Sequence, residues 1–231
     1  MQCKPFVNLL AAVCLAGPLM AGCTVQYNKD ATVRDVVTPT DATIIEYHVR
    51  SYQADLKEFI TRLYARNPKY EKDPKRRQMK IDAIFRRGFF AKHLRKGKSS
   101  AELLSAAFSP ASAGEDRIYL LGQGLVKSIK EAYGLDEIDV FWSGLQVPLE
   151  RLQRLHFNLS QVNWRLKTYK DQAGNLLFLT NGMGENGYIN MGYEVLMTRI
   201  LTRIEDDISM RGGLANKYMF RMSTIFLTIA L

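Results

Sequence analysis

Cysteine, histidine and carboxylate side chains are the groups of this chain that could do chemistry, and the cysteines are the most unevenly placed. All three, Cys3, Cys14 and Cys23, lie within the first tenth of the 231-residue chain, and residues 24–231 contain none. The body of the protein therefore offers no thiol nucleophile, no thiolate metal site and no disulfide. Chemistry at sulfur is expected only near the N-terminus.

The three histidines, His48, His93 and His156, do not fall at the spacings that metal sites use. The sequence also lacks H-E-x-x-H, C-x-x-C and G-x-S-x-G motifs. His48 and His156 lie next to apolar positions of predicted helices, which favours hydrogen-bonded histidines at the edge of a core. The sequence therefore predicts no catalytic residues, no metal site and no cofactor.

Two groups of carboxylates are close enough in sequence to suggest acid–base chemistry. They are Glu71, Asp73 and Asp82 in one group and Glu205, Asp206 and Asp207 in the other. Both groups lie on the polar side of a helical pattern, where carboxylates are normally solvated. We therefore expect them to be exposed to solvent and to have no catalytic role.

The glycines Gly182, Gly184 and Gly187 match the G-x-G-x-x-G spacing of dinucleotide-binding turns. That fold needs a second parallel strand and further strand–helix units, whereas only 44 residues follow Gly187 and their pattern is mostly helical. The favoured interpretation is a loop that needs the positive φ available to glycine.

The N-terminal segment has the three zones of a secretory signal peptide. A basic start at Lys4 precedes an apolar stretch at residues 6–20, and small residues follow at Ala21 and Gly22. The apolar stretch is shorter than the roughly 20 residues that a membrane-spanning helix needs. A buried N-terminal helix is disfavoured because Gly17 and Pro18 would break it.

The end of this segment, Leu19-Met20-Ala21-Gly22-Cys23, resembles the lipobox of bacterial lipoproteins. The resemblance implies that the Cys23 thiol receives a diacylglyceryl group, that the chain is cut between Gly22 and Cys23, and that the new amine is acylated. Three acyl chains would hold the protein firmly on a bilayer. Because Thr24, not Asp, follows the cysteine, the resemblance further implies the periplasmic face of the outer membrane. A signal-anchored, unlipidated protein is the alternative.

Basic residues are concentrated between Arg66 and Lys98, a segment with thirteen basic and three acidic residues against a net charge of +9 for the whole chain. An exported protein rarely meets nucleic acid, so the expected partners are anionic headgroups or an acidic envelope protein. We predict a docking face formed by Arg76, Arg77, Arg86, Arg87, Arg95 and Lys96. The alternative is a solvated helical face that only aids solubility.

The body that positions these residues is predicted to be mainly α-helical. After a polar tether at residues 23–41, six stretches space their apolar residues three and four apart, as in helices. They are residues 42–65, 74–85, 100–108, 116–134, 149–169 and 193–208. A competing interpretation makes residues 164–169 the first strand of a hairpin, and a short extended segment at 176–180 stays open. The apolar residues 224–231 are expected to pack into the body.

These observations predict one helical domain of about six helices with irregular loops, spanning residues 42–231. The leading functional hypothesis is a non-enzymatic envelope lipoprotein that binds an anionic component or a protein. The second hypothesis is a hydrolase acting on an envelope polymer or lipid, which no residue pattern in the sequence supports.

Overall fold

The computed structural model describes residues 40–86, 89, 97–112, 114–135, 146–183, 187 and 189–212. The chain separates into two compact units, and all described residues belong to the second, which spans residues 38–231. The predicted signal peptide, the residues of the predicted tether up to 39 and the C-terminal residues 213–231 lie outside the described residues.

Six α-helices make up most of the described part of the chain. They are α3 (Thr40–Arg66), α4 (Pro74–Phe85), α5 (Ser100–Phe108), α6 (Arg117–Tyr133), α7 (Leu149–Thr168) and α8 (Gly192–Ser209). A 3₁₀ turn (Pro110–Ser112) and two short antiparallel strands, β1 (Gly182–Met183) and β2 (Ile189–Asn190), complete it. The prediction of a mainly helical domain with about six helices is confirmed.

The helix ends follow the capping signals of the sequence. At the start of α5, the N–H of Glu102 donates to the Ser99 hydroxyl and the N–H of Ser99 donates to the Glu102 carboxylate. At the start of α6, the Asp116 carboxylate accepts from two backbone N–H groups of the first turn. α6 ends where Gly134 adopts a φ of 65°, a conformation that glycine reaches without strain.

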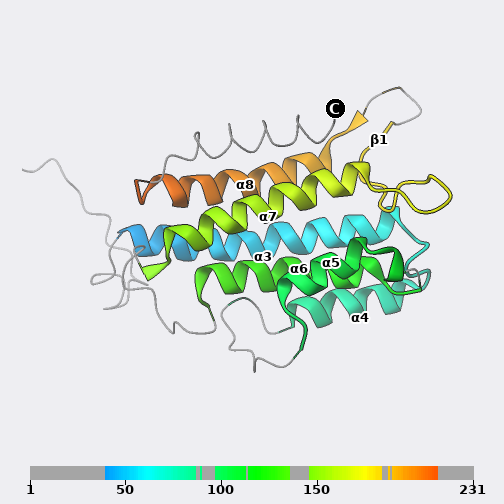
Figure 1. Cartoon of the computed structure of the whole chain (residues 1–231), viewed down its shortest axis with the longest axis horizontal. Helices are drawn as coiled ribbons and strands as arrows, with labels where there is room; N and C mark the ends of the chain where they lie inside the picture. Colours follow the sequence, from blue (N-terminus) through cyan, green and yellow to red (C-terminus); the bar gives the residue numbers. More distant parts are fainter. Residues whose placement is uncertain are drawn as a thin grey trace, which may run out of the picture. The chain divides into compact units, whose positions relative to one another are not determined.

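Helix α6 lies at the centre of the packing, in contact with α3, α4, α5 and α7 (Figure 1). Two glycines let its neighbours come close. A Cβ atom at Gly122 would lie 2.7 Å from Cδ1 of Ile84 on α4, and one at Gly124 would lie 2.8 Å from Cγ of Leu104 on α5. The backbone N of Leu104 would be only 3.1 Å away, so α5 could not give way by a side-chain shift alone.

The remaining helices cover α6 with the apolar stripes that the sequence predicts. Helix α3 packs on α6 and α8, and α7 packs on α6 and lies beside α8 (Figure 1). All six predicted core positions of α3 are buried: Ile45, Val49, Tyr52, Leu56, Phe59 and Leu63. The predicted face of α8 is also buried, apart from the half-buried Leu201.

The sequence pattern predicts Met79, Ile81, Ile84 and Phe85 on the inner side of the helix at 74–85, and for Met79 this prediction is wrong. Ile81, Ile84 and Phe85 are buried, whereas Met79 is 62% exposed. At 100° per residue, Met79 lies almost opposite Ile81 on the helix, so it faces away when Ile81 packs against the body.

The structure also decides between the two interpretations of residues 164–180. Helix α7 continues to Thr168, so the longer helical prediction is confirmed and a strand at 164–169 is wrong. A turn follows, closed by the hydrogen bond from the N–H of Asp171 to the carbonyl of Asn175 at 2.7 Å and by an isolated bridge between Lys170 and Leu176. Residues 177–180 form no regular strand.

We predict that Gly124→Val lowers the free energy of unfolding by about 2 kcal/mol, because the new side chain would collide with Leu104 and push α5 away from α6. Gly114→Val is the matched control, since nothing lies within 4 Å of a Cβ at that position. Its effect should stay within about 0.5 kcal/mol. Urea denaturation measures both, and equal stabilities of the two variants would contradict this view of the α5–α6 contact.

Candidate functional site

The predicted site residues divide into those that the structure describes and those that it does not. Gly22 and Cys23, the predicted cleavage and lipidation residues, lie outside the described residues. So do Arg87, Arg95 and Lys96 of the predicted docking face. The other three residues of that face, Arg76, Arg77 and Arg86, belong to α4 or directly follow it.

The solvent side of α4 and the residue that follows it carry three exposed cations. Lys75, Arg76 and Arg86 are exposed, while Arg77 is half-buried, with a buried Nε atom that makes no hydrogen bond. The Arg76 Nε lies 3.7 Å from the Asp73 carboxylate, an exposed contact of little energetic weight. The described part of the predicted face is therefore a surface of cations whose charges are mostly open to solvent.

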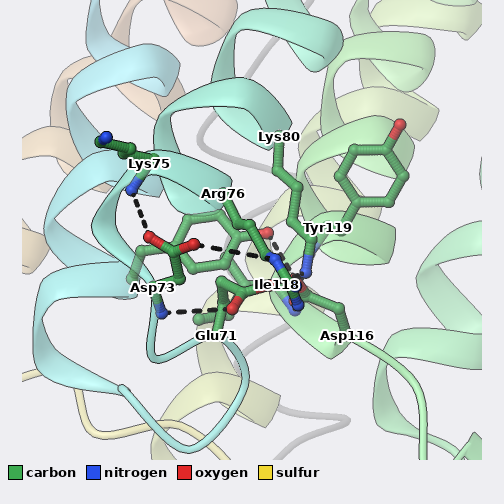
Figure 2. Close-up of polar contacts among 9 residues, drawn as sticks. Glu71, Asp73, Lys75, Arg76, Lys80, Asp116, Ile118 and Tyr119 are labelled. Atoms are coloured by element: carbon green, nitrogen blue, oxygen red, sulfur yellow. Dashed lines mark hydrogen bonds and ion pairs between the residues drawn. The ribbon is translucent and has the colours of Figure 1, made fainter.

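A polar cluster fixes α4 to the start of α6 (Figure 2). The Lys80 ammonium donates to Glu71 and to Asp116, each at 2.7 Å. Asp116 is also the N-cap of α6 and accepts a hydrogen bond from the Tyr64 hydroxyl of α3 at 2.8 Å. One carboxylate thus connects three helices, and the basic face of α4 is held in a fixed orientation on the body.

The charges of this cluster shift the ionisation of its members. Burial and then the Asp116 carboxylate raise the pKa of Tyr64 far above its ordinary value, so that the hydroxyl stays protonated and donates. Burial lowers the pKa of Lys80, but its hydrogen bonds to Asp116 and Glu71 outweigh this and leave the pKa raised. The Lys80 hydrogen bond lowers the pKa of Glu71. Lys80 and Glu71 are therefore charged and paired at neutral pH.

The carboxylate group at 205–207 does not behave as predicted. Asp207 is 0% exposed, so the prediction that it is solvated is wrong. Its carboxylate lies 2.7 Å from His48 Nδ1 and accepts from the Tyr133 hydroxyl at 2.5 Å and the Tyr52 hydroxyl at 3.5 Å. The sequence does hold a signal for this burial, because Asp207 comes three residues after Ile204 and so falls on the apolar face of α8.

This Asp207 cluster is a structural connection between helices. Burial, followed by the Asp207 charge, raises the pKa of Tyr52, and burial also raises the pKa of Tyr133, so both hydroxyls remain donors. Asp207, Tyr52 and Tyr133 are closed off from solvent, and His48 is only 9% exposed. The cluster joins α3, α6 and α8 in place of an apolar contact.

The histidines and the remaining carboxylates of the 205–207 group are not gathered at one site. His156 Nε2 lies 2.9 Å from the Glu205 carboxylate, and Asp206 is exposed. His48 and His156 are thus buried and hydrogen-bonded, as predicted for histidines at the edge of a core. Over the described residues, no group of three or more histidines, cysteines and carboxylates could hold a metal ion.

The glycine-rich segment has the wrong setting for a dinucleotide site. β1 and β2 are antiparallel neighbours that flank it, whereas the dinucleotide fold requires parallel strands joined through a helix. Gly187 has a φ of 79°, which supports the predicted loop interpretation. Gly184 lies outside the described residues.

Compared with protein-family models, with curated proteins and with solved structures, the chain has no significant match. None of the described helices is both long and apolar enough to cross a membrane. The function must therefore be inferred from the surfaces of this helical domain and from its N-terminal sequence.

We predict that Tyr133→Phe lowers the free energy of unfolding by about 2 kcal/mol, because it removes a buried hydrogen bond to a charged carboxylate. Tyr119→Phe on the same helix is the control. Its half-buried ring has no partner for its hydroxyl among the described residues, so its effect should stay within about 0.5 kcal/mol. Thermal and urea denaturation measure both. A Tyr133→Phe protein as stable as the control would show that the Asp207 cluster contributes nothing to folding.

Proposed function

We propose that this chain is a lipid-anchored envelope protein whose helical body binds an anionic surface through α4, without catalysing a reaction. The anchor is Cys23, cut from Gly22 and acylated, and the expected location is the periplasmic face of the outer membrane. The observation that supports the binding role is the solvent side of α4, where Lys75, Arg76 and Arg86 are exposed.

The folded body does not need these cations for its own packing. The side of α4 that faces the body is held by Ile81, Ile84, Phe85 and the charged contacts of Lys80. Among the described residues, the exposed cations of α4 form one ion pair, that of Arg76 with Asp73, and it is weak. Charges that folding does not use are available to a partner.

The lipid anchor explains how as few as three cations could hold α4 against an anionic membrane. A basic residue near an anionic membrane contributes about 1 kcal/mol, so three would contribute about 3 kcal/mol, less than the roughly 4 kcal/mol of a millimolar complex. Between free molecules such an interaction is weak at physiological salt and becomes measurable only at low salt, where screening is reduced. An anchored body stays at high effective concentration beside the headgroups, where weak contacts are occupied.

The predicted tether would let the body reach the surface. The residues between Cys23 and the start of α3 at Thr40 would span about 20–25 Å as a random coil. Electrostatic attraction is screened within about 8 Å at physiological salt, so α4 binds only when it lies against the headgroups. The tether and α4 therefore act together, the first by limiting distance and the second by setting orientation.

Vesicle binding tests the role of α4 apart from the lipid. Residues 38–231 form one compact unit, so the chain from Thr24 onward can be studied unlipidated. At low salt we expect it to float with phosphatidylglycerol-containing vesicles and not with phosphatidylcholine vesicles. The double variant Lys75→Glu/Arg76→Glu should bind at least about thirty-fold more weakly, from about 1 kcal/mol for each basic residue lost.

Lys170→Glu is the control for a single exposed charge reversal away from α4, and it should bind like the wild type. Raising the salt to 1 M, where the screening length falls to about 3 Å, should release the wild-type protein. Vesicle binding that changes neither in the Lys75→Glu/Arg76→Glu variant nor at 1 M salt would rule out this docking surface.

A further inference from the structure

A second basic surface lies away from the exposed side of α4, in a cleft between α5, α6 and α7. The cleft has a volume of about 630 Å³ and is lined by the first turn of α5, the second half of α6 and the first half of α7. This volume falls within the range of small-molecule sites, about 300–1,000 Å³. None of the three described residues of the predicted docking face, Arg76, Arg77 and Arg86, lines it.

Among the described residues, four cations and one carboxylate line this cleft. Lys127 and Lys130 come from α6 and Arg151 and Arg154 from α7, against Glu131 alone. Within each pair the residues are three apart, so each helix presents both of its cations on one side. The formal charge of this lining is therefore +3, and it arises only because α6 packs against α7.

These four cations are not equally available to a ligand. Lys130 is only 2% exposed, and both Lys130 and Arg151 have contacts elsewhere in the chain. The Lys127 ammonium donates to the carbonyl of Lys98 at 2.7 Å. Arg154 is exposed and makes no hydrogen bond or ion pair within the described structure. The Arg154 guanidinium is thus the group that a ligand would engage first, while the others set the potential around it.

The start of α5 adds backbone N–H donors to this positively charged cleft. The capping box uses the N–H groups of Ser99 and Glu102, whereas those of Ser100 and Ala101 have no partner within the helix. The positive end of the helix dipole lies at the same place. The Ser100 hydroxyl donates to Glu131, so the single carboxylate of the cleft is already bonded at this end.

We propose that this cleft binds a small molecule through a phosphate or diphosphate group. An arginine fork and a helix N-terminus both suit the oxygens of a phosphate, and cations on two facing helices suit a group with more than one negative charge. The volume exceeds that of a phosphate, so the rest of the ligand lies against Leu155, Ala132 and the Asn158 amide. A soluble phosphorylated compound and the phosphate of a lipid headgroup share this chemistry.

This proposal does not rest on the binding role of α4. Lys80 of α4 contacts Asp116 at the start of α6, whereas the cleft begins at Lys127 in the second half of α6. At 1.5 Å per residue, Asp116 and Lys130 lie about 20 Å apart along the helix axis. A charge reversal at Lys75 can therefore serve as the control for one in the cleft.

Calorimetric titration of the purified full-length mature protein in a neutral detergent tests the proposal, with inorganic diphosphate as the probe. We expect saturable binding with a dissociation constant below about 1 mM. Arg154→Glu should weaken it at least about ten-fold, as expected for the loss of one charge-assisted hydrogen bond. Asn158→Asp, which adds a negative charge without changing side-chain shape, should weaken it as well. Lys75→Glu should bind as the wild type does.

A second arm distinguishes the two sources of the phosphate. Phosphatidylcholine vesicles containing phosphatidic acid are added, without detergent, to the unlipidated chain from Thr24 onward and to its Arg154→Glu variant, so that acyl chains do not contribute to vesicle binding. Arg154-dependent binding of the vesicles without binding of soluble diphosphate would support the proposal and assign the site to a lipid headgroup. Binding of soluble diphosphate would support it for a soluble ligand.

Two results would overturn the proposal. One is a wild-type protein that binds neither soluble diphosphate nor phosphatidic acid vesicles. The other is binding that Arg154→Glu and Asn158→Asp leave unchanged while both variants keep the wild-type melting temperature, because the phosphate would then lie outside the cleft.

Discussion

The burial of α6 determines how the neighbouring helices are placed. This helix contacts four others, and Gly122 and Gly124 let α4 and α5 come closer than any side chain would allow. Polar connections lie at both ends of the helix, at Asp116 toward α3 and α4 and at Tyr133 toward α3 and α8. Because residues 24–231 contain no cysteine, these contacts and the apolar core hold the domain together without disulfides.

The same arrangement separates two basic surfaces. One side of α4 packs on α3 and α6 and leaves its cations in solvent, whereas the packing of α6 on α7 brings together lysines and arginines that are distant in sequence. In the proposed function, the first surface orients an anchored body on anionic headgroups. In the further inference, the second recognises a phosphate group.

Much of the fold could be predicted from local sequence signals. Apolar residues three and four apart gave the helices, and Ser99, Asp116 and Gly134 marked helix ends correctly, because periodicity and capping depend on neighbouring residues. The proposed functional surfaces are harder to predict from the sequence. The prediction that Asp207 is solvated is wrong because the tyrosines and the histidine that bond it come from other helices. No sequence spacing predicts the cleft cations, because helix packing brings them together.

The proposed function requires that Cys23 becomes the acylated first residue of the mature protein and anchors this domain to a bilayer. Mass spectrometry of tryptic peptides from the protein purified from its native membrane tests this requirement. A lipid-anchored protein yields the peptide Cys23-Thr-Val-Gln-Tyr-Asn-Lys29 carrying three acyl chains. A peptide that still begins at Met1, or a Cys23 peptide without fatty chains, would contradict the claim.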